Sequence, residues 1–392
     1  MRTTADSVGG MSSTAIPNPS LPISGVGLRR NQVGSLELSG EEELHRLVLL
    51  HYHLADSLQS LLPPPAASSD RDYAHPSSSA SVVLSMPFLH KLLDALLTCE
   101  SDFKSLLLLV LSRKLGVISR PPLDRGVHDL LDGFIKTLDL CNAVSRSLQS
   151  LRHWNRHANI AATALHRPNP PSLPPQLSRA RRALSKLLLS DCSCLDSSSS
   201  TCRRVCQICS AARHLNTVAP GILTPRNDSG GAAVLVVAVI TIRFLLRFAI
   251  WAMVTAFSCS VGTVPPLPPL PPPARQMPWA APMSSLQERI AEELRTAMKE
   301  KVAAGAATTG MLVETLAVER SGRKAMKMLS SGNEAGEAAE ELADASRRLE
   351  EALGPLERKV REVFHRFVRC RTDVLKRLHE DRRSSSPTDA LQ

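Results

Sequence analysis

The segment AAVLVVAVITIRFLLRFAIWAMVTAF, from Ala232 to Phe257, decides how the rest of the chain is arranged. Its 26 residues include 14 Val, Leu, Ile and Phe, and roughly 20 apolar residues suffice for a helix to cross a bilayer. Two arginines, Arg243 and Arg247, interrupt it. The apolar side chains contribute roughly −4 to −8 kcal/mol to insertion, whereas two central arginines cost about 5 to 7 kcal/mol. Because the two sums nearly cancel, insertion into a bilayer is marginal.

The two arginines are four residues apart, so they share one face of a helix. This geometry fits a helix that lies in the membrane interface with both arginines toward phosphates. It also fits a helix packed in a bundle with its arginines at the rim, and a spanning helix is the third alternative. Seven side chains are expected to make the membrane contact: Val236, Ile240, Arg243, Leu246, Arg247, Ile250 and Trp251.

Charge is concentrated in the middle of the chain. The net charge is +10, but residues 1–150 hold 13 Lys and Arg against 15 Asp and Glu, and residues 283–392 hold 20 against 19. Residues 151–282 hold 14 against 3. A basic block beside an apolar segment indicates contact with anionic membrane lipid. Nucleic acid is the weaker alternative, because no recognised motif or aromatic stacking platform accompanies the charge.

The composition favours an all-α fold. The chain is 43% hydrophobic but only 3% aromatic, which suits Leu-rich helix packing better than sheets. We expect a bundle of long helices with coiled-coil-like C-terminal helices, disordered linkers and one hydrophobic, membrane-associated or core helix. The expected regions are a tail (1–40), an N-terminal helical region (41–166), a basic Ser/Cys/Pro-rich linker with short helices (167–231), the hydrophobic helix (232–257), a Pro-rich linker (258–283), a C-terminal helical region (284–381) and a tail (382–392).

The C-terminal region carries an approximate 3-4 repeat of apolar residues, which is typical of a helix-packing seam. Packing within the chain is one interpretation, and a seam for a partner's helix is the other. Gly354-Pro355 is expected to kink or restart the helix. The Pro-rich run 264–273 is expected to be a stiff spacer that holds Trp279 away from the apolar segment. The candidate partner-binding residues are Leu349, Leu356, Val360, Val363 and Phe367.

No enzyme motif stands out. The sequence has no GxxxxGK[ST], GxGxxG, GxSxG or HExxH pattern, so we expect neither catalysis, a cofactor nor a small-molecule substrate. The pairs His51/His53 and His153/His157 are interpreted as solvated or capping histidines.

Five cysteines crowd into one Ser-rich segment, where zinc binding and surface thiols are both open; they are Cys192, Cys194, Cys202, Cys206 and Cys209. The N-terminus, MRTTADSVGG, has no apolar core of a secretory signal, so we expect reduced thiols in a cytosolic setting.

Six ordered stretches together resemble the plant ROH/BYPASS-related family. No single stretch is specific, but they follow one another in the family's order and span about two-thirds of the chain. The stretches are LRRNQV (28–33), FLHKLLD (88–94) with CESDFK (99–104), PPLDR (121–125), LDLCNAV (138–144), WAAPM (279–283) and PLERKVREVFHR (355–366).

The resemblance implies a helical plant protein without known catalytic residues. It implies binding to Exo-seventy-type subunits of the exocyst and a role in polarised secretion at the cytosolic face of a plasma membrane or endomembrane. The BYPASS branch implies instead a regulator of root-to-shoot growth signalling, and the motifs leave both branches open. Since the resemblance treats both halves of the chain as one unit with cytosolic partners, a surface or core helix is favoured over a single span.

Overall fold

The computed structural model describes residues 37–63, 83–113, 118, 120–121, 123–166, 174–188, 231–257, 267–303, 310–331 and 336–384. Every regular element in this part of the chain is a helix and none is a strand, which confirms the all-α prediction. The helices are α1 (Glu37–Ser60), α2 (Met86–Arg113), α3 (Leu123–Leu165), α4 (Pro174–Leu188), α6 (Gly231–Phe257), α7 (Pro272–Arg275), α8 (Ala280–Ala303), α9 (Val313–Ser330) and α10 (Gly336–Ser384). The expected 1–40 tail, the Cys cluster and the last residues fall mostly or wholly outside the described ranges.

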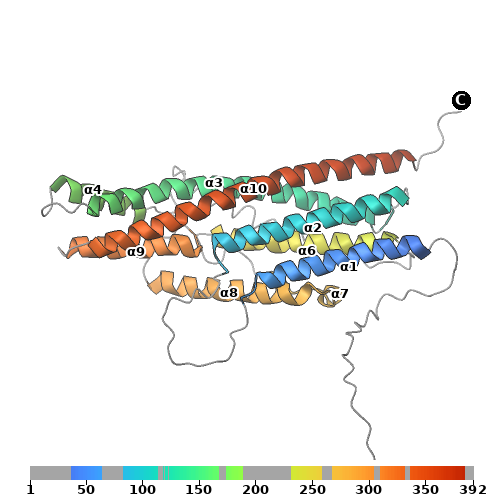
Figure 1. Cartoon of the computed structure of the whole chain (residues 1–392), viewed down its shortest axis with the longest axis horizontal. Helices are drawn as coiled ribbons and strands as arrows, with labels where there is room; N and C mark the ends of the chain where they lie inside the picture. Colours follow the sequence, from blue (N-terminus) through green and yellow to red (C-terminus); the bar gives the residue numbers. More distant parts are fainter. Residues whose placement is uncertain are drawn as a thin grey trace, which may run out of the picture.

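The helices form an elongated bundle whose long axis follows its two longest members (Figure 1). Helix α3 has 43 residues and α10 has 49, which at 1.5 Å per residue makes them roughly 65 and 74 Å long. Helix α10 packs along both α3 and α2, and it pairs with α9 near its start. Helices α4 and α9 lie together at one end of the bundle, and α10 ends at the other (Figure 1).

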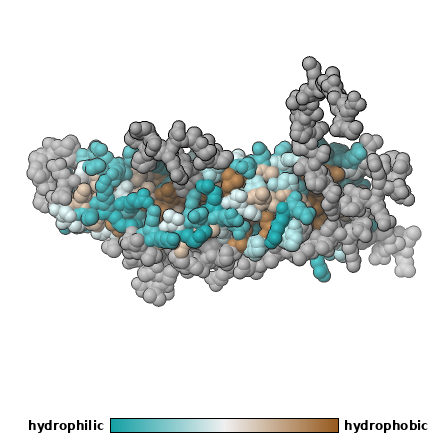
Figure 2. All heavy atoms as spheres, turned by 90° about the horizontal axis from the view of Figure 1, so that it is seen from below, coloured by the Kyte–Doolittle hydropathy of each residue, from teal (hydrophilic) through white to brown (hydrophobic). Residues whose placement is uncertain are grey.

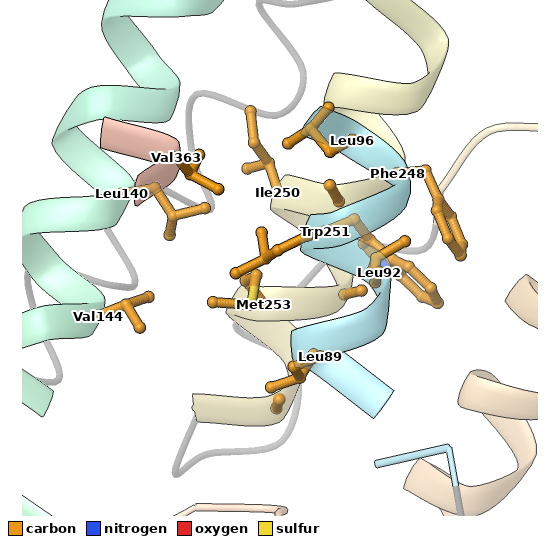
Figure 3. Packing of buried hydrophobic residues seen from close by; sticks show 14 of the residues in the cluster. Leu89, Leu92, Leu96, Leu140, Val144, Phe248, Ile250, Trp251, Met253 and Val363 are labelled. Atoms are coloured by element: carbon orange, nitrogen blue, oxygen red, sulfur yellow. The ribbon is translucent and has the colours of Figure 1, made fainter. Parts of the chain in front are cut away.

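Helix α6 is the core of the bundle. It packs against α1, α2, α3 and α8, and 22 of its 27 residues are buried. Figure 3 shows Leu92 of α2 beside Trp251 of α6, and Leu140 of α3 on the opposite side, toward Ile250 and Met253. A helix that is apolar on all sides is stable in water only when other elements cover it, and the Leu-rich faces of α1, α2 and α3 do so here.

Buried polar contacts fix the register of α3 against α10. Asn155 donates through Nδ2 to the backbone oxygen of Ser346 at 2.9 Å, and the Ser346 hydroxyl donates to Asn155 Oδ1 at 2.7 Å. Arg152 forms an ion pair with Glu357 at 2.8 Å further along the same pair of helices. A buried hydrogen bond that is broken leaves an unsatisfied group, so sliding α10 along α3 is disfavoured.

The start of α2 is held by helices distant in sequence. The Glu293 carboxylate of α8 accepts hydrogen bonds from the backbone amides of Val83 and Leu84 at 2.9 and 2.8 Å. Glu314 of α9 accepts one from the Met86 amide at 3.0 Å. Orphan amides at a helix start need acceptors, and a carboxylate also interacts favourably with the helix dipole. Residues 83–86 therefore join the two halves of the chain into one unit.

Of the two alternatives expected at Gly354-Pro355, a kink or a restart of the C-terminal helix, the restart is wrong. Helix α10 continues without a break through Pro355. Proline removes one backbone hydrogen bond, but Glu351, whose carbonyl loses its partner, is exposed, so water can satisfy that oxygen. Packing of the flanking turns against α3 and α2 keeps the helix continuous.

The spacer interpretation of the Pro-rich run is also wrong for its described part. The backbone oxygen of Leu267 accepts a hydrogen bond from Gln287 of α8 at 2.9 Å, and Leu270 is buried. Trp279 is fully buried, with its ring centroid 5.9 Å from that of Phe244 in α6. The segment thus brings Trp279 onto the apolar helix instead of holding it away, because the indole buries more apolar area there than it could in solvent.

Candidate functional site

The residues expected to contact a membrane lie inside the protein. Val236, Leu246, Ile250 and Trp251 are at most 4% exposed, and Ile240 is half-buried. Within the described ranges, α6 alone is long and apolar enough to cross a bilayer, and 78% of its most apolar window is buried in the bundle. Of the three arrangements open from the sequence, the structure therefore has the core helix.

Arg243 reaches the rim of the bundle, as the core-helix alternative expects. Its Nη2 atom lies 3.0 Å from Oδ2 of Asp129 on α3, and that carboxylate is half exposed. Burial lowers the pKa of Arg243, and the charge and hydrogen bond of Asp129 oppose that shift. The ion pair lets a charged residue stand in an apolar helix, since a paired charge costs far less to bury than an isolated one.

Arg247 has a different environment one turn further along α6. Its side chain is 6% exposed, and its Nε atom is buried without a hydrogen-bond partner. The structure gives it no ion pair with any described carboxylate. Burial alone lowers its pKa. Arg247 is thus the costlier of the two arginines, and nothing in the sequence separates it from Arg243.

Helix α1 places two buried polar groups, His51 and Glu43, against the first half of α6, and His51 makes a hydrogen bond there. His51 is buried, and its Nε2 atom lies 3.0 Å from the Thr241 hydroxyl, which itself donates to the Val237 carbonyl at 3.0 Å. Nε2–H is therefore the donor to Thr241. Burial lowers the pKa of His51 to about 4, so the ring is neutral at pH 7. The Glu43 carboxylate, also fully buried, lies against Gly231 at the positive end of α6.

The histidines only partly match their interpretation. His53 and His153 are exposed, and His53 pairs with Asp102 at 2.8 Å, as expected for solvated groups. For His51 the interpretation is wrong, because the side chain is buried against Thr241. Its neighbours in the sequence, Leu50 and Leu54, are core residues, and that periodicity was the signal for burial.

The five seam residues of α10 face the inside of the molecule. Each is at most 1% exposed, and they pack toward α2 and α3. Phe367 meets Phe134 of α3 edge to face, with ring centroids 5.1 Å apart. The seam is therefore used within the chain, and partner binding through it stays a prediction that requires α10 to move. The five residues are Leu349, Leu356, Val360, Val363 and Phe367.

The core holds a void too small for a ligand. It measures about 20 Å³ and lies between α2, α3, α6 and α10, with lining residues that include Leu96, Cys141, Ile250 and Val363. Ligand pockets are about 300 Å³ or more, and an apolar void of this size stays dry. Its apolar lining offers no catalytic constellation.

The described residues offer no metal site. They contain no group of three or more His, Cys, Asp or Glu that could hold an ion, and the Cys192–Cys209 cluster lies outside them. The three described cysteines, Cys99, Cys141 and Cys370, are free and buried. Burial raises the pKa of Cys141 to about 12 and also raises the pKa of the other two thiols. Buried thiols of this kind are unreactive.

Helix α4 lies in the region expected to be a basic linker with short helices, residues 167–231. It starts at Pro174, has 15 residues, and packs on α3 and α9. Its buried residues, Ala180, Ala183, Leu184 and Leu187, recur at helical spacing. The opposite side carries exposed basic side chains, which makes α4 the most one-sided charged surface among the described helices.

Comparison with known proteins identifies the family. The ROH1-like family matches residues 16–207 and 197–378. Protein ROH1A of Arabidopsis thaliana is 29% identical over 414 aligned residues, which cover 92% of this chain and 96% of ROH1A. Protein ROH1D of the same plant is 29% identical over 343 residues, covering 76% and 83%. No solved structure matches the chain. The bundle built around α6 is thus the fold of a chain that belongs to the ROH1-like family.

Proposed function

We propose that the chain is a non-enzymatic helical adaptor at the cytosolic face of a plant membrane. In this role it binds an Exo-seventy-type subunit of the exocyst and modulates polarised secretion. Family membership supports the proposal, because the resemblance implies exocyst binding. The observation that carries it is the filled core, in which side chains of α2, α3, α6 and α10 leave a void of only about 20 Å³. A molecule built this way acts through its outer surface.

Attachment to the membrane is peripheral in this proposal. Helix α6 is covered by α1, α2, α3 and α8, so spanning a bilayer would require the bundle to open and expose its whole core. Opening exposes apolar area worth about 25 cal/mol per Å² and separates the Glu293 and Glu314 contacts that hold α2. Anionic lipid at the surface is the partner, and insertion of α6 is not needed.

The exocyst contact is assigned to the outer face of α10. Its seam residues are buried, but Val368 and Leu375 on the other side are 38% and 39% exposed and seven residues apart. Residues seven apart lie on the same face of a helix, where apolar side chains can dock a second helix. Exposed charged residues, including Arg361 and Arg369, flank this pair.

Affinity capture from plant cells tests the proposal. The full chain should recover exocyst subunits, and the variant Val368→Glu/Leu375→Glu should lose most of them. The matched control, Leu44→Glu/Tyr52→Glu on α1, changes two similarly exposed apolar residues and should capture normally. Repeated capture by the full chain without any exocyst subunit contradicts the proposal. Equal capture by both variants contradicts only the assignment to α10.

The other two functions have less support. Both relatives named above carry the ROH1 name, which favours the exocyst alternative over the root-to-shoot signalling of the BYPASS branch. A graft of a wild-type shoot on a mutant root tests that signalling role, because a normal shoot excludes it. Nucleic-acid binding predicts salt-sensitive retention on DNA or RNA, and its absence at low salt excludes that role.

A further inference from the structure

One helix at the end of the bundle carries only positive charge. Helix α4 contains Arg179, Arg181, Arg182 and Lys186 and no acidic residue, and all four side chains are exposed. Arg179, Arg182 and Lys186 are spaced i, i+3 and i+7, so they form a stripe on one face of the helix. We call these four residues the α4 basic face. Helix α10, in contrast, has twelve Lys and Arg against eleven Asp and Glu.

The described residues around α4 do not neutralise the α4 basic face. None of its four residues forms an ion pair with a described carboxylate, and the sequence has no Asp or Glu between Asp139 and Asp191. Helix α4 packs on α3 and α9. On α9, Glu319 is 3% exposed and forms an ion pair with Arg323, so the Glu319 carboxylate is neutralised within its own helix.

The positive charge of the α4 basic face also affects His157 on the neighbouring helix α3. Its pKa is lowered by burial and by the charge of Lys186 on α4. Arg152, on the same acid-free part of α3, does find partners, but they are Glu350 and Glu357 of α10 on another side of the helix. The carboxylates that neutralise this part of α3 thus lie on α10, and the α4 basic face has no counter-ion among the described residues.

Packing holds the α4 basic face outward. The apolar side of α4 is buried through Ala183, Leu184 and Leu187, and Trp154 of α3 donates through Nε1 to the Leu187 carbonyl at 2.9 Å. A Cβ added at Gly322 of α9 would lie 2.8 Å from Leu187 Cδ2, so the two helices are in close contact. Because the apolar side is already used, α4 cannot insert it into a bilayer, and what it offers a partner is charge.

We propose that the α4 basic face docks the protein on the anionic phospholipid headgroups of a membrane. The argument is charge complementarity: four cations without a described counter-ion lie on the outer side of a helix. No aromatic side chain lies among them, as stacking on single-stranded nucleic acid would need. The inference rests on the proposed function for the existence of a membrane role, and it assigns that role to α4 in place of α6.

The position of α4 fits this role. It lies at the end of the elongated bundle opposite to the C-terminal end of α10, where Val368 and Leu375 are exposed (Figure 1). Docking through α4 therefore leaves the far half of α10 open to a cytosolic partner. Figure 2 shows that charged and polar side chains are interspersed with apolar ones on the face seen from below, so no large continuous apolar surface competes there among the described residues.

Vesicle co-sedimentation of the purified full chain tests the inference. The protein should bind phosphatidylcholine vesicles that contain phosphatidylserine, fail to bind phosphatidylcholine alone, and be released by high salt. Each Lys or Arg near the surface contributes about fivefold to affinity, so Arg179→Gln/Arg182→Gln/Lys186→Gln should weaken binding about 100-fold. The matched control, Arg358→Gln/Arg369→Gln/Lys376→Gln on α10, removes the same charge from exposed positions and should bind nearly as the parent does.

The possible results separate clearly. Equal weakening by both triple variants, or none by either, overturns the inference, and binding that survives both high salt and the α4 variant points to insertion of α6. Tighter salt-sensitive binding to RNA than to vesicles, lost in the α4 variant, assigns the face to nucleic acid instead.

Circular dichroism melts of both variants should match the parent, because every changed residue is exposed. The assay contains no exocyst subunit, so its failure leaves exocyst capture untouched.

Discussion

Helix α4 turns all its charge toward solvent, whereas helix α6 buries its two arginines in the core. Both come from the basic middle of the chain, and both were candidates for membrane contact on composition. Their neighbours make the difference: α4 has one apolar side and is covered on that side only, whereas α6 is apolar all round and is covered by four helices. Length and hydropathy therefore describe what a helix can bury, and the bundle determines what it does bury.

The largest effect is expected from a charge placed in α6. Leu245 is fully buried, so Leu245→Asp puts an unpaired carboxylate into the core and should cost more than about 4 kcal/mol of unfolding free energy. Thermal melting followed by circular dichroism should show loss of the cooperative transition. Leu177→Asp on α4, where the parent side chain is 40% exposed, should change stability by about 0.5 kcal/mol or less. Equal effects at the two sites would remove the contrast between the helices.

The next effect is a dependence on pH through the α1–α6 contact. The pKa of His51 is about 4 in the folded chain, against 6.5 for a solvated histidine, the value expected in the unfolded chain. Between these values the unfolded chain binds the extra proton, so stability is lost as the pH falls from 6.5 toward 4. The full loss is about 3 kcal/mol.

Urea unfolding at pH 7 and pH 4.5 measures this dependence. The variant His51→Gln should lose most of the pH dependence that the parent shows above its carboxylate titrations. The variant His53→Gln, at an exposed position, should keep it. An unchanged pH dependence in His51→Gln contradicts burial of that ring against Thr241.

The two arginines of α6 should respond differently to an apolar replacement. Arg247→Met removes a buried charge with no counter-ion among the described residues and should raise the unfolding free energy by about 1 to 3 kcal/mol. Arg243→Met also loses the Asp129 ion pair, so its gain should be smaller by about 1 kcal/mol. Denaturant midpoints with unchanged slopes give both values. A loss of stability in Arg247→Met would mean that the arginine has a stabilising partner.

The smallest effect on folding is expected on the α4 basic face. Arg182→Gln should change the unfolding free energy by about 0.5 kcal/mol or less, because the side chain is exposed and has no described counter-ion. The same change should weaken binding to anionic vesicles about fivefold. A large loss of stability together with weaker binding would show that Arg182 serves the fold, and the contrast with α6 would then be less sharp.

Much of the helix content could be predicted from the sequence. The N-terminal helical region expected over 41–166 contains most of α1 and all of α2 and α3, and the C-terminal region expected over 284–381 contains α9 and most of α8 and α10. Apolar residues at helical spacing and prolines at the boundaries are local signals, so they predict a helix independently of the elements that it packs against. The hydrophobic helix expected over 232–257 differs from α6 by one residue.

The packing partners could not be predicted in the same way. Nothing local shows that Trp279 contacts Phe244, that Glu293 holds the start of α2, or that Asp129 pairs with Arg243 but no described carboxylate pairs with Arg247. These contacts depend on which helices become neighbours. The arrangement of the helices is set by the burial of the apolar faces of all of them together. The continuity of α10 through Pro355 could not be predicted for the same reason, since tertiary packing outweighs the local cost of a proline.

The central claim is that α6 is a core helix and that the protein reaches the membrane through charge. Membranes pelleted from plant cells that express the full chain, washed first with high salt and then with alkaline carbonate, test it most directly. We expect the protein to pellet with membranes and to be released by salt, and the α4 triple variant to be largely soluble before any wash. Retention of the chain through carbonate would contradict the claim, because it would show that Ala232–Phe257 is integrated in the bilayer.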